Sequence, residues 1–193
     1  MPARRLLAAV LAGTAIATIL TLQWLGLRST LVRDFSVPMF WIKEAFCAAL
    51  GAGGLVAVAR LARPGARLGR VRAAVAAPLI AMWLLAALAL LVADAGDRGV
   101  LIFGQTAKVC SARIALISSP LFVAVLAATR GLAPTRLRLA GAAGGFAAGS
   151  IGAFVYSLHC PELAAPFLGL WYVLGILIPT AVGAWVGTRV LRW

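Results

Sequence analysis

The segment YSLHCPE, residues 156–162, gathers several side chains that can do chemistry. It holds the only histidine of the chain, His159, directly followed by Cys160. A second cysteine, Cys110, lies in KVCSAR between two basic residues, and cations near a thiol favour its reactive thiolate form. Two thiols can form a disulfide where their Cα atoms lie within about 7 Å of each other. Together with the His159 imidazole they would also make a soft ligand set for a thiophilic metal ion, so the sequence leaves both chemistries open.

The stretch FWIKEAFC, residues 40–47, adds a lysine and the third cysteine. Lys43 and Cys47 are four residues apart and therefore share one face of a helix, whereas Glu44 points elsewhere. Lys43 either extends outward to lipid headgroups or faces the helix bundle and pairs with an acidic residue: Asp94, Asp97 or Glu162. We expect Cys47, which lies deeper, to be a packing residue. Three charges are candidates to support the cysteine pair: Lys43, Lys108 and Glu162.

The elements that must position these residues are membrane helices. Of the 193 residues, 63% are hydrophobic, and the mean hydropathy is +1.02, whereas a soluble domain is about 45–50% apolar. A membrane-spanning helix needs roughly 20 apolar residues, and six segments qualify: 6–27, 36–59, 73–93, 109–129, 139–158 and 165–187. The connections are too short to hold a soluble domain. We therefore predict an all-α integral membrane protein, with residues 1–193 forming a single six-helix transmembrane domain.

The net charge of +13 indicates orientation and not nucleic-acid binding. The basic residues interrupt apolar runs and never form a stripe interleaved with aromatic residues. Twelve of the 18 lie at the two termini or in the connections after the second and fourth segments. The positive-inside rule then places both termini in the cytoplasm of a multi-pass bacterial inner-membrane protein. The same rule places Cys110 and Cys160 at one depth, facing an oxidising compartment.

Small residues recur every four positions in the segment 139–158. One row is Gly141, Gly145, Gly149 and Ala153, and a second is Gly144, Ala148 and Gly152, continuing into Tyr156 and Cys160. Such rows let membrane helices pack closely, so we expect this helix at the centre of the bundle. A short connection joins it to segment 109–129, and the two should be antiparallel neighbours whose outer ends bring the thiols close.

Several motifs, spread over nearly the whole chain, resemble the NrsF family of membrane anti-sigma factors. They are FWIK at 40–43, LARPGAR at 61–67, Cys110, LAPTRLRLAG at 132–141, YSLHCPE, and LWYVLGIL followed by RVLRW. The resemblance implies a six-helix inner-membrane protein that negatively regulates an extracytoplasmic-function sigma factor. It also implies that Cys110 and Cys160 match the paired cysteines with which the family responds to metal or oxidative stress. Enzyme activity, a cofactor beyond transient heavy-metal binding, and direct nucleic-acid binding are not expected.

The docking site of the sigma factor stays open at this point. Family members usually begin with a polar cytoplasmic segment, whereas only residues 1–5 precede the first apolar segment here. Either the natural start lies further upstream, or the basic connections 60–72 and 130–138 bind the partner. The alternative for these connections is that their arginines only set the topology.

Two other functions compete with regulation. A small transporter or proton-coupled permease could use Lys43 and Glu44 as charges on a pathway, although charge is nearly absent from the inner half of every segment. A membrane thiol oxidoreductase could use Cys110 and Cys160, although there is no CxxC motif and no visible cofactor site.

Overall fold

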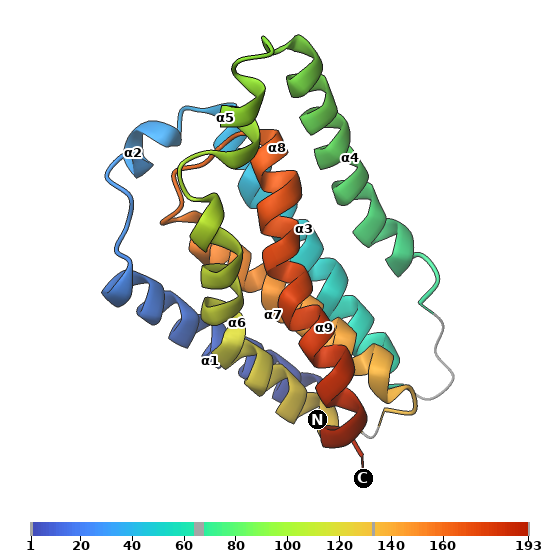
Figure 1. The fold of residues 1–193 in the computed structure, drawn as a ribbon. Coiled ribbons are helices and arrows are strands. Elements are labelled where there is room, and N and C mark those ends of the chain that lie inside the picture. Colours follow the sequence, from blue (N-terminus) through green and yellow to red (C-terminus); the bar gives the residue numbers. More distant parts are fainter. Residues whose placement is uncertain (1, 64–67, 133, 193) are drawn as a thin grey trace.

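The computed structural model describes residues 2–63, 68–132 and 134–192, and within them the chain is helical without a strand (Figure 1). The long helices are α1 Pro2–Trp24, α3 Pro38–Leu61, α4 Val71–Val92, α6 Ala107–Arg130, α7 Leu137–Ser157 and α9 Val173–Val190. Two short helices, α2 Leu31–Asp34 and α5 Arg98–Phe103, lie in the connections. A helical turn, α8 Ala165–Phe167, and a π-helical segment, η1 Leu168–Tyr172, lead directly into α9.

Six stretches of the described chain are long and apolar enough to cross a membrane: Arg4–Trp24, Pro38–Leu61, Val71–Val92, Arg98–Arg130, Leu137–Ser157 and Ala165–Val190. They coincide with the six predicted segments, which confirms the predicted fold class. The fourth stretch begins earlier than expected, because α5 precedes α6 and adds to its length. Pro38 opens α3 at its first position, where a missing N–H and a fixed φ suit a helix start.

Helix α7 forms the centre of the bundle, as its small residues predicted. Of the 18 residues in its most apolar stretch, 67% are buried, whereas the share in α4 is 11%. Helix α7 packs against α9, α3, α6 and α1. The two rows of small residues face different partners. A Cβ on Gly149 would lie 2.8 Å from Cγ of Pro179 in α9, and one on Gly152 would lie 2.6 Å from Cβ of Ser118 in α6. Only glycine therefore allows α7 to approach both helices at once.

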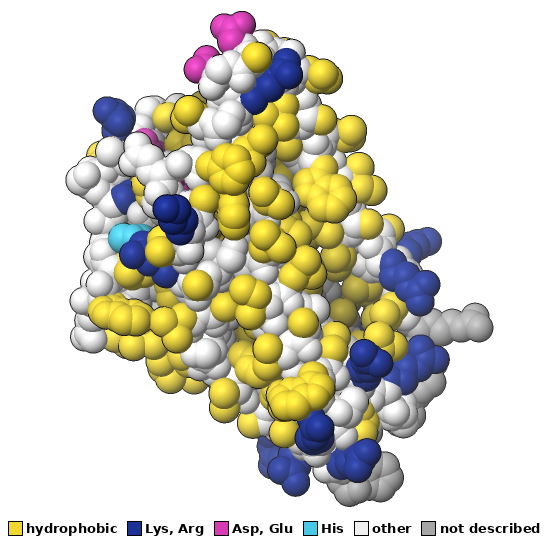
Figure 2. All heavy atoms as spheres, viewed as in Figure 1, with side chains coloured by type: hydrophobic (Ala, Val, Ile, Leu, Met, Phe, Trp, Pro, Cys, Tyr) yellow, Lys and Arg dark blue, Asp and Glu magenta, His cyan; other side chains and the backbone are white. Residues whose placement is uncertain are grey.

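Helix α4 lies at the side of the bundle, next to α3 and α8 (Figure 1). Its outward leucines are largely exposed, Leu84 by 66% and Leu91 by 78%. Figure 2 shows apolar side chains over most of the visible face. An apolar surface of this extent is what a helix bundle presents to lipid.

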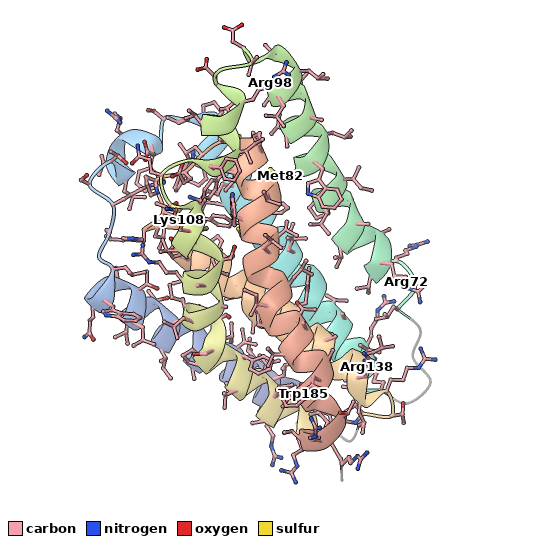
Figure 3. All side chains as sticks on the ribbon, in the orientation of Figure 1. Arg72, Met82, Arg98, Lys108, Arg138 and Trp185 are labelled. Atoms are coloured by element: carbon pink, nitrogen blue, oxygen red, sulfur yellow. The ribbon has the colours of Figure 1, made fainter. Side chains whose placement is uncertain are left out.

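The bundle has two chemically different ends. Helix α1 begins and α9 ends at one of them, which also holds the α3–α4 and α6–α7 connections (Figure 1). Basic side chains gather there, among them Arg72 and Arg138 (Figures 2 and 3), and we call it the arginine end. The opposite end, with the α1–α3, α4–α6 and α7–α8 connections, carries Cys110 and Cys160 and is the cysteine end. The two ends of the chain thus share one side, and its cytoplasmic location stays a prediction.

Candidate functional site

The two predicted sensor cysteines meet at the cysteine end. Cys110 lies in the first turn of α6, and Cys160 lies in the α7–α8 connection, residues 158–164. Both side chains are fully buried in one core cluster, both are free thiols, and the Cys110 side chain lowers the pKa of Cys160. Two cysteines that are far apart in the sequence are therefore buried in the same cluster at one end of the bundle.

Cys160 is the more acidic thiol of the pair. The hydrogen bond with the Cys110 side chain is the first reason that the pKa of Cys160 falls to about 5. Burial opposes this shift, while the positive charge of Lys43, the Tyr172 side chain and a backbone hydrogen bond from Glu162 reinforce it. A thiol with this pKa is a thiolate at neutral pH, and the thiolate is the nucleophile. The site is thus arranged for Cys160 to attack first.

Lys43 extends into the bundle. Its side chain is fully buried, and Nζ donates hydrogen bonds to the carbonyl oxygens of Cys160, at 2.8 Å, and Glu162, at 3.1 Å. The ammonium group also lies 5.3 Å from the centre of the Tyr172 ring. Of the two alternatives, the structure therefore shows the one in which Lys43 faces the bundle, and Glu162 is one of its partners through the backbone carbonyl and not through the carboxylate. Glu44 points elsewhere, as expected, and accepts a hydrogen bond from Ser157.

The Glu162 carboxylate joins the loop of Cys160 to the helix of Cys110. Its Oε1 accepts hydrogen bonds from the backbone N–H groups of Gln105, at 2.7 Å, and Thr106, at 3.2 Å, just before α6. A carboxylate is favourable there because the first N–H groups of a helix lack partners within the helix. Gly104, with φ of +49°, makes room: a Cβ on it would lie 2.5 Å from Oε2 of Glu162. The Thr106 hydroxyl in turn lies 3.8 Å from the Cys160 sulfur.

Arg28 provides a second buried cation, which the sequence analysis missed. Its Nη1 donates to the Cys160 carbonyl at 2.6 Å, and its Nε lies 3.2 Å from Oδ2 of Asp34. Thr30 donates to the same Asp34 oxygen at 2.8 Å, and the guanidinium lies over the Phe40 ring. The loop of Cys160 is thus held from the α1–α3 connection as well as from α3. No local pattern could have indicated this contact, because its partners are 132 residues apart.

The remaining predicted site residues lie outside the thiol pair. His159 is half-buried, with Nδ1 3.1 Å from the Gly26 carbonyl oxygen and its ring against Tyr156. Lys108 is exposed near the start of α6 (Figure 3). In the described parts of the chain, no three His, Cys, Asp or Glu side chains are grouped to hold a metal ion. The structure therefore does not assemble the predicted set of two thiols and an imidazole.

Two further features of the core surround the thiols. Cys47 is fully buried in the same apolar cluster, as expected of a packing residue. The segment η1 carries Tyr172 toward Cys160, while Trp171 donates from its indole nitrogen to the Ile102 carbonyl at 2.9 Å. Single π-helical turns are frequent at functional sites, and apolar periodicity alone gives no sign of them.

A family model and two related proteins all assign the chain to the same family. The family model described as NrsF, "Negative regulator of sigma F", matches residues 1–193. A protein of Azospira oryzae named "Probable anti-sigma-F factor NrsF" is 51% identical over 181 residues, which cover 94% of this chain and 85% of the relative. The "Anti-sigma-F factor NrsF" of Caulobacter vibrioides is 39% identical over 194 residues, covering 100% of this chain and 90% of the relative. No solved structure matches significantly.

Proposed function

The chain belongs to the NrsF family, the negative regulators of sigma F, and from this membership we propose how it works. It is an integral inner-membrane anti-sigma factor that holds an extracytoplasmic-function sigma factor inactive. It releases this partner when its two outward-facing thiols meet an oxidant or a thiophilic metal ion. The names of both relatives support a sigma-factor partner, and six apolar helices support a place in the bilayer. The role is regulatory and needs no catalytic residue.

The single observation that carries the sensing half of this proposal is that Cys110 and Cys160 are fully buried in the same core cluster at one end of the bundle. The pair lies at the end of the bundle opposite the arginines, which are the side chains suited to an acidic surface of a partner. Helix α6 begins at Ala107, just before Cys110, and ends at Arg130, so one helix, interrupted only by Pro120, connects the two ends. A change in the spacing of α6 and α7 at the thiols would reach the 130–138 connection.

Oxidation by hydrogen peroxide illustrates the chemistry. The Cys160 thiolate attacks one peroxide oxygen, so that an S–O bond forms, the O–O bond breaks, and the hydroxide that leaves takes up a proton. The Cys110 sulfur then attacks the Cys160 sulfur, the S–S bond forms, and the second hydroxide leaves as water with the Cys110 proton. In total, two thiols lose two electrons and one peroxide yields two waters. A thiophilic metal ion would instead bridge the two sulfurs without electron transfer.

The distribution of buried charge favours a regulator over a permease. Among the described residues, the buried charged side chains are Arg28, Asp34, Lys43 and Glu44, and all lie toward the cysteine end. A proton-coupled pathway would need ionisable groups deeper in the bundle. A thiol oxidoreductase would need a second redox centre, and the third cysteine, Cys47, is packed in the apolar core.

A pull-down from detergent-solubilised membranes tests the proposal. The tagged full-length chain should retain a sigma factor, identified by mass spectrometry, and lose most of it on addition of peroxide or cadmium. In Cys110→Ser and in Cys160→Ser, the fraction of sigma factor bound should stay the same with and without peroxide. Cys47→Ser, a matched control in the same core, should respond as the wild type does.

The two halves of the proposal can fail separately. If no sigma factor is retained from reduced membranes, the anti-sigma role of this chain is wrong. If a sigma factor is retained but both Cys110→Ser and Cys160→Ser still release it normally, the thiol switch is wrong.

A further inference from the structure

Lys43 is a buried cation whose surroundings suit the charged form. It is fully buried, and its Nζ meets two carbonyl oxygens and one aromatic ring face. An ammonium has three N–H donors and no acceptor, and these three neighbours are all electron-rich. Within the described parts of the chain, no donor is directed at the nitrogen, as a neutral amine with a lone pair would require. The geometry therefore indicates an ammonium.

No carboxylate of the described residues forms an ion pair with Lys43, although the Glu44 carboxylate acts on it electrostatically. Among the residues that the structure describes, the one ion pair joins Arg28 to Asp34. Glu44 accepts from Ser157, and the Glu162 carboxylate is bound to the N–H groups that precede α6, offering Lys43 only its backbone carbonyl. A buried charge is strongly unfavourable without an opposite charge near it. Lys43 therefore needs an anion from another kind of side chain.

The Cys160 sulfur is the group that can provide this anion. Lys43 already binds the backbone of Cys160, and its charge acts on the sulfur of the same residue. The titratable or charged groups that surround the sulfur come from every element packed against it: Lys43, Cys47, Cys110, Tyr156, Tyr172, Glu162 and Arg28. Together these neighbours lower the pKa of the Cys160 thiol to about 5.

We propose that the Cys160 thiolate is the counter-ion of Lys43, and that Lys43 is the positioning residue that sets both the oxidation rate and the redox potential of the cysteine pair. This rests on the proposed function, because Lys43 tunes the same thiol switch. Arg28 contributes differently: Asp34 already neutralises it, so that it holds the Cys160 carbonyl without needing the sulfur.

The pairing of Lys43 with the Cys160 thiolate speeds the oxidation of the thiol but shifts the thiol–disulfide equilibrium toward the reduced form. The Lys43 charge increases the thiolate fraction of Cys160, and a larger thiolate fraction speeds the attack on an oxidant. A disulfide carries no charge, so oxidation leaves the ammonium without its counter-ion and disfavours the oxidised form. Lys43 therefore makes the switch fast while keeping it reduced at rest. The unbalanced ammonium of the oxidised state also destabilises the resting arrangement of the 158–164 loop, which it holds.

The charge of Lys43 can be removed with little change of shape. Lys43→Gln keeps a donor for the two carbonyl oxygens but carries no charge. The full-length protein in detergent or nanodiscs is treated with hydrogen peroxide, and disulfide formation is followed by alkylation mass shift. The equilibrium between the two free thiols and the disulfide is then measured in buffers with different ratios of reduced to oxidised glutathione, and its midpoint is the ratio at which half of the protein is oxidised. We expect oxidation to be at least tenfold slower, and the midpoint to shift at least tenfold toward the disulfide, equivalent to about 30 mV for two electrons.

Two controls separate charge from packing. Lys108→Gln removes an exposed lysine near the same helix start, and Glu44→Gln removes a buried charge next to Lys43 in sequence. Both should change the rate and the midpoint by less than twofold. If Lys43→Gln instead slows oxidation and also disfavours the disulfide, Lys43 is only a structural support and the proposal is wrong. Unchanged rate and midpoint would also overturn it.

A second measurement tests the counter-ion without the switch. The ultraviolet absorbance of the thiolate is titrated in the wild type and in Cys160→Ser, and the difference reports Cys160 alone. In Lys43→Gln, or in Lys43→Met if the first variant does not fold, the midpoint should rise by about three pH units, because only a pKa near 8 reduces the thiolate fraction about tenfold at neutral pH. An unmoved midpoint would refute the counter-ion. If peroxide forms no disulfide in the wild type, the thiol switch fails, while this titration still decides the role of Lys43.

Discussion

The two ends of the bundle use the same kind of side chain in opposite ways. At the cysteine end, Arg28 and Lys43 are at most 8% exposed and hold the backbone of one short loop. At the other end, every described arginine is exposed: Arg4, Arg5, Arg60, Arg63, Arg70, Arg72, Arg130, Arg136, Arg138, Arg189 and Arg192. Basic charge at the cysteine end thus holds a buried loop, whereas at the arginine end it lies at the surface, where Arg60 donates to the Leu68 carbonyl and Arg189 lies over the Trp185 ring.

The physical reason for the difference is solvent. Exposed charges are screened by water and salt, so each contributes little to folding and much of its effect is on association. Buried charges are weakly screened, and removing one partner leaves the other uncompensated. The cysteine end should consequently be sensitive to single substitutions that the arginine end tolerates.

The largest effect should come from breaking the helix that both ends share. Gly145 of α7 faces the Pro179 carbonyl in α9 so closely that even a methyl group would collide with the backbone. Gly145→Leu should push α7 and α9 apart and reduce the yield of folded protein severely, because the side chain would meet backbone atoms, which cannot rotate out of its way. Size-exclusion chromatography and thermal unfolding of the detergent-solubilised protein measure this.

The matched control is Gly96→Leu, because nothing lies within 4 Å of a Cβ at Gly96. This variant should keep the yield and melting temperature of the wild type. Wild-type behaviour of Gly145→Leu as well would show that the small-residue row faces lipid and that α7 does not couple the two ends.

The fold was predictable because its signals are local. Length and hydropathy of each apolar run define a spanning helix, and the four-residue spacing of small residues indicates close packing of α7. Which row faces which helix was not predictable, since that depends on how α6 and α9 are arranged around α7. The short helices α2 and α5 were missed because their few residues carry no period of their own.

The site was predictable only in part. Topology alone places Cys110 and Cys160 at one end, and the structure brings their thiols together. The network around them is formed by backbone carbonyls, which a sequence does not display. Lys43 finds its acceptors 117 and 119 residues away, so its own helix could indicate a bundle-facing cation but not that backbone carbonyls would bind it. The partner of His159, the Gly26 carbonyl oxygen, is likewise 133 residues away and could not be read from the sequence.

The second-largest effect should be on stability, when the same substitution, arginine to glutamine, is made at each end of the bundle. Arg28→Gln breaks a buried pair and leaves Asp34 uncompensated, for which a loss of about 3–5 kcal/mol in the free energy of unfolding is typical. Arg138→Gln changes an exposed side chain and should stay within about 0.5 kcal/mol. Thermal and denaturant unfolding in the same detergent measure both. Equal losses for the two variants would remove the distinction between the ends.

The smallest effect per residue should be on binding at the arginine end. Arg130, Arg136 and Arg138 are exposed in and beside the α6–α7 connection. If this connection binds the sigma factor, the triple glutamine variant should associate more slowly, and its affinity should depend less on salt, because fewer charges remain to be screened. Each arginine should account for only a few-fold change in affinity, as exposed pairs do.

Biolayer interferometry with the purified sigma factor, at low and high salt, measures this directly. The matched control is Arg33→Gln with Arg98→Gln, which removes two exposed arginines from the cysteine end. This control should leave affinity and salt dependence unchanged, since the proposed partner is on the other side of the membrane. If the triple variant binds with the wild-type rate and the wild-type salt dependence, the arginines of this connection serve topology only. The sigma factor must then dock elsewhere on the chain.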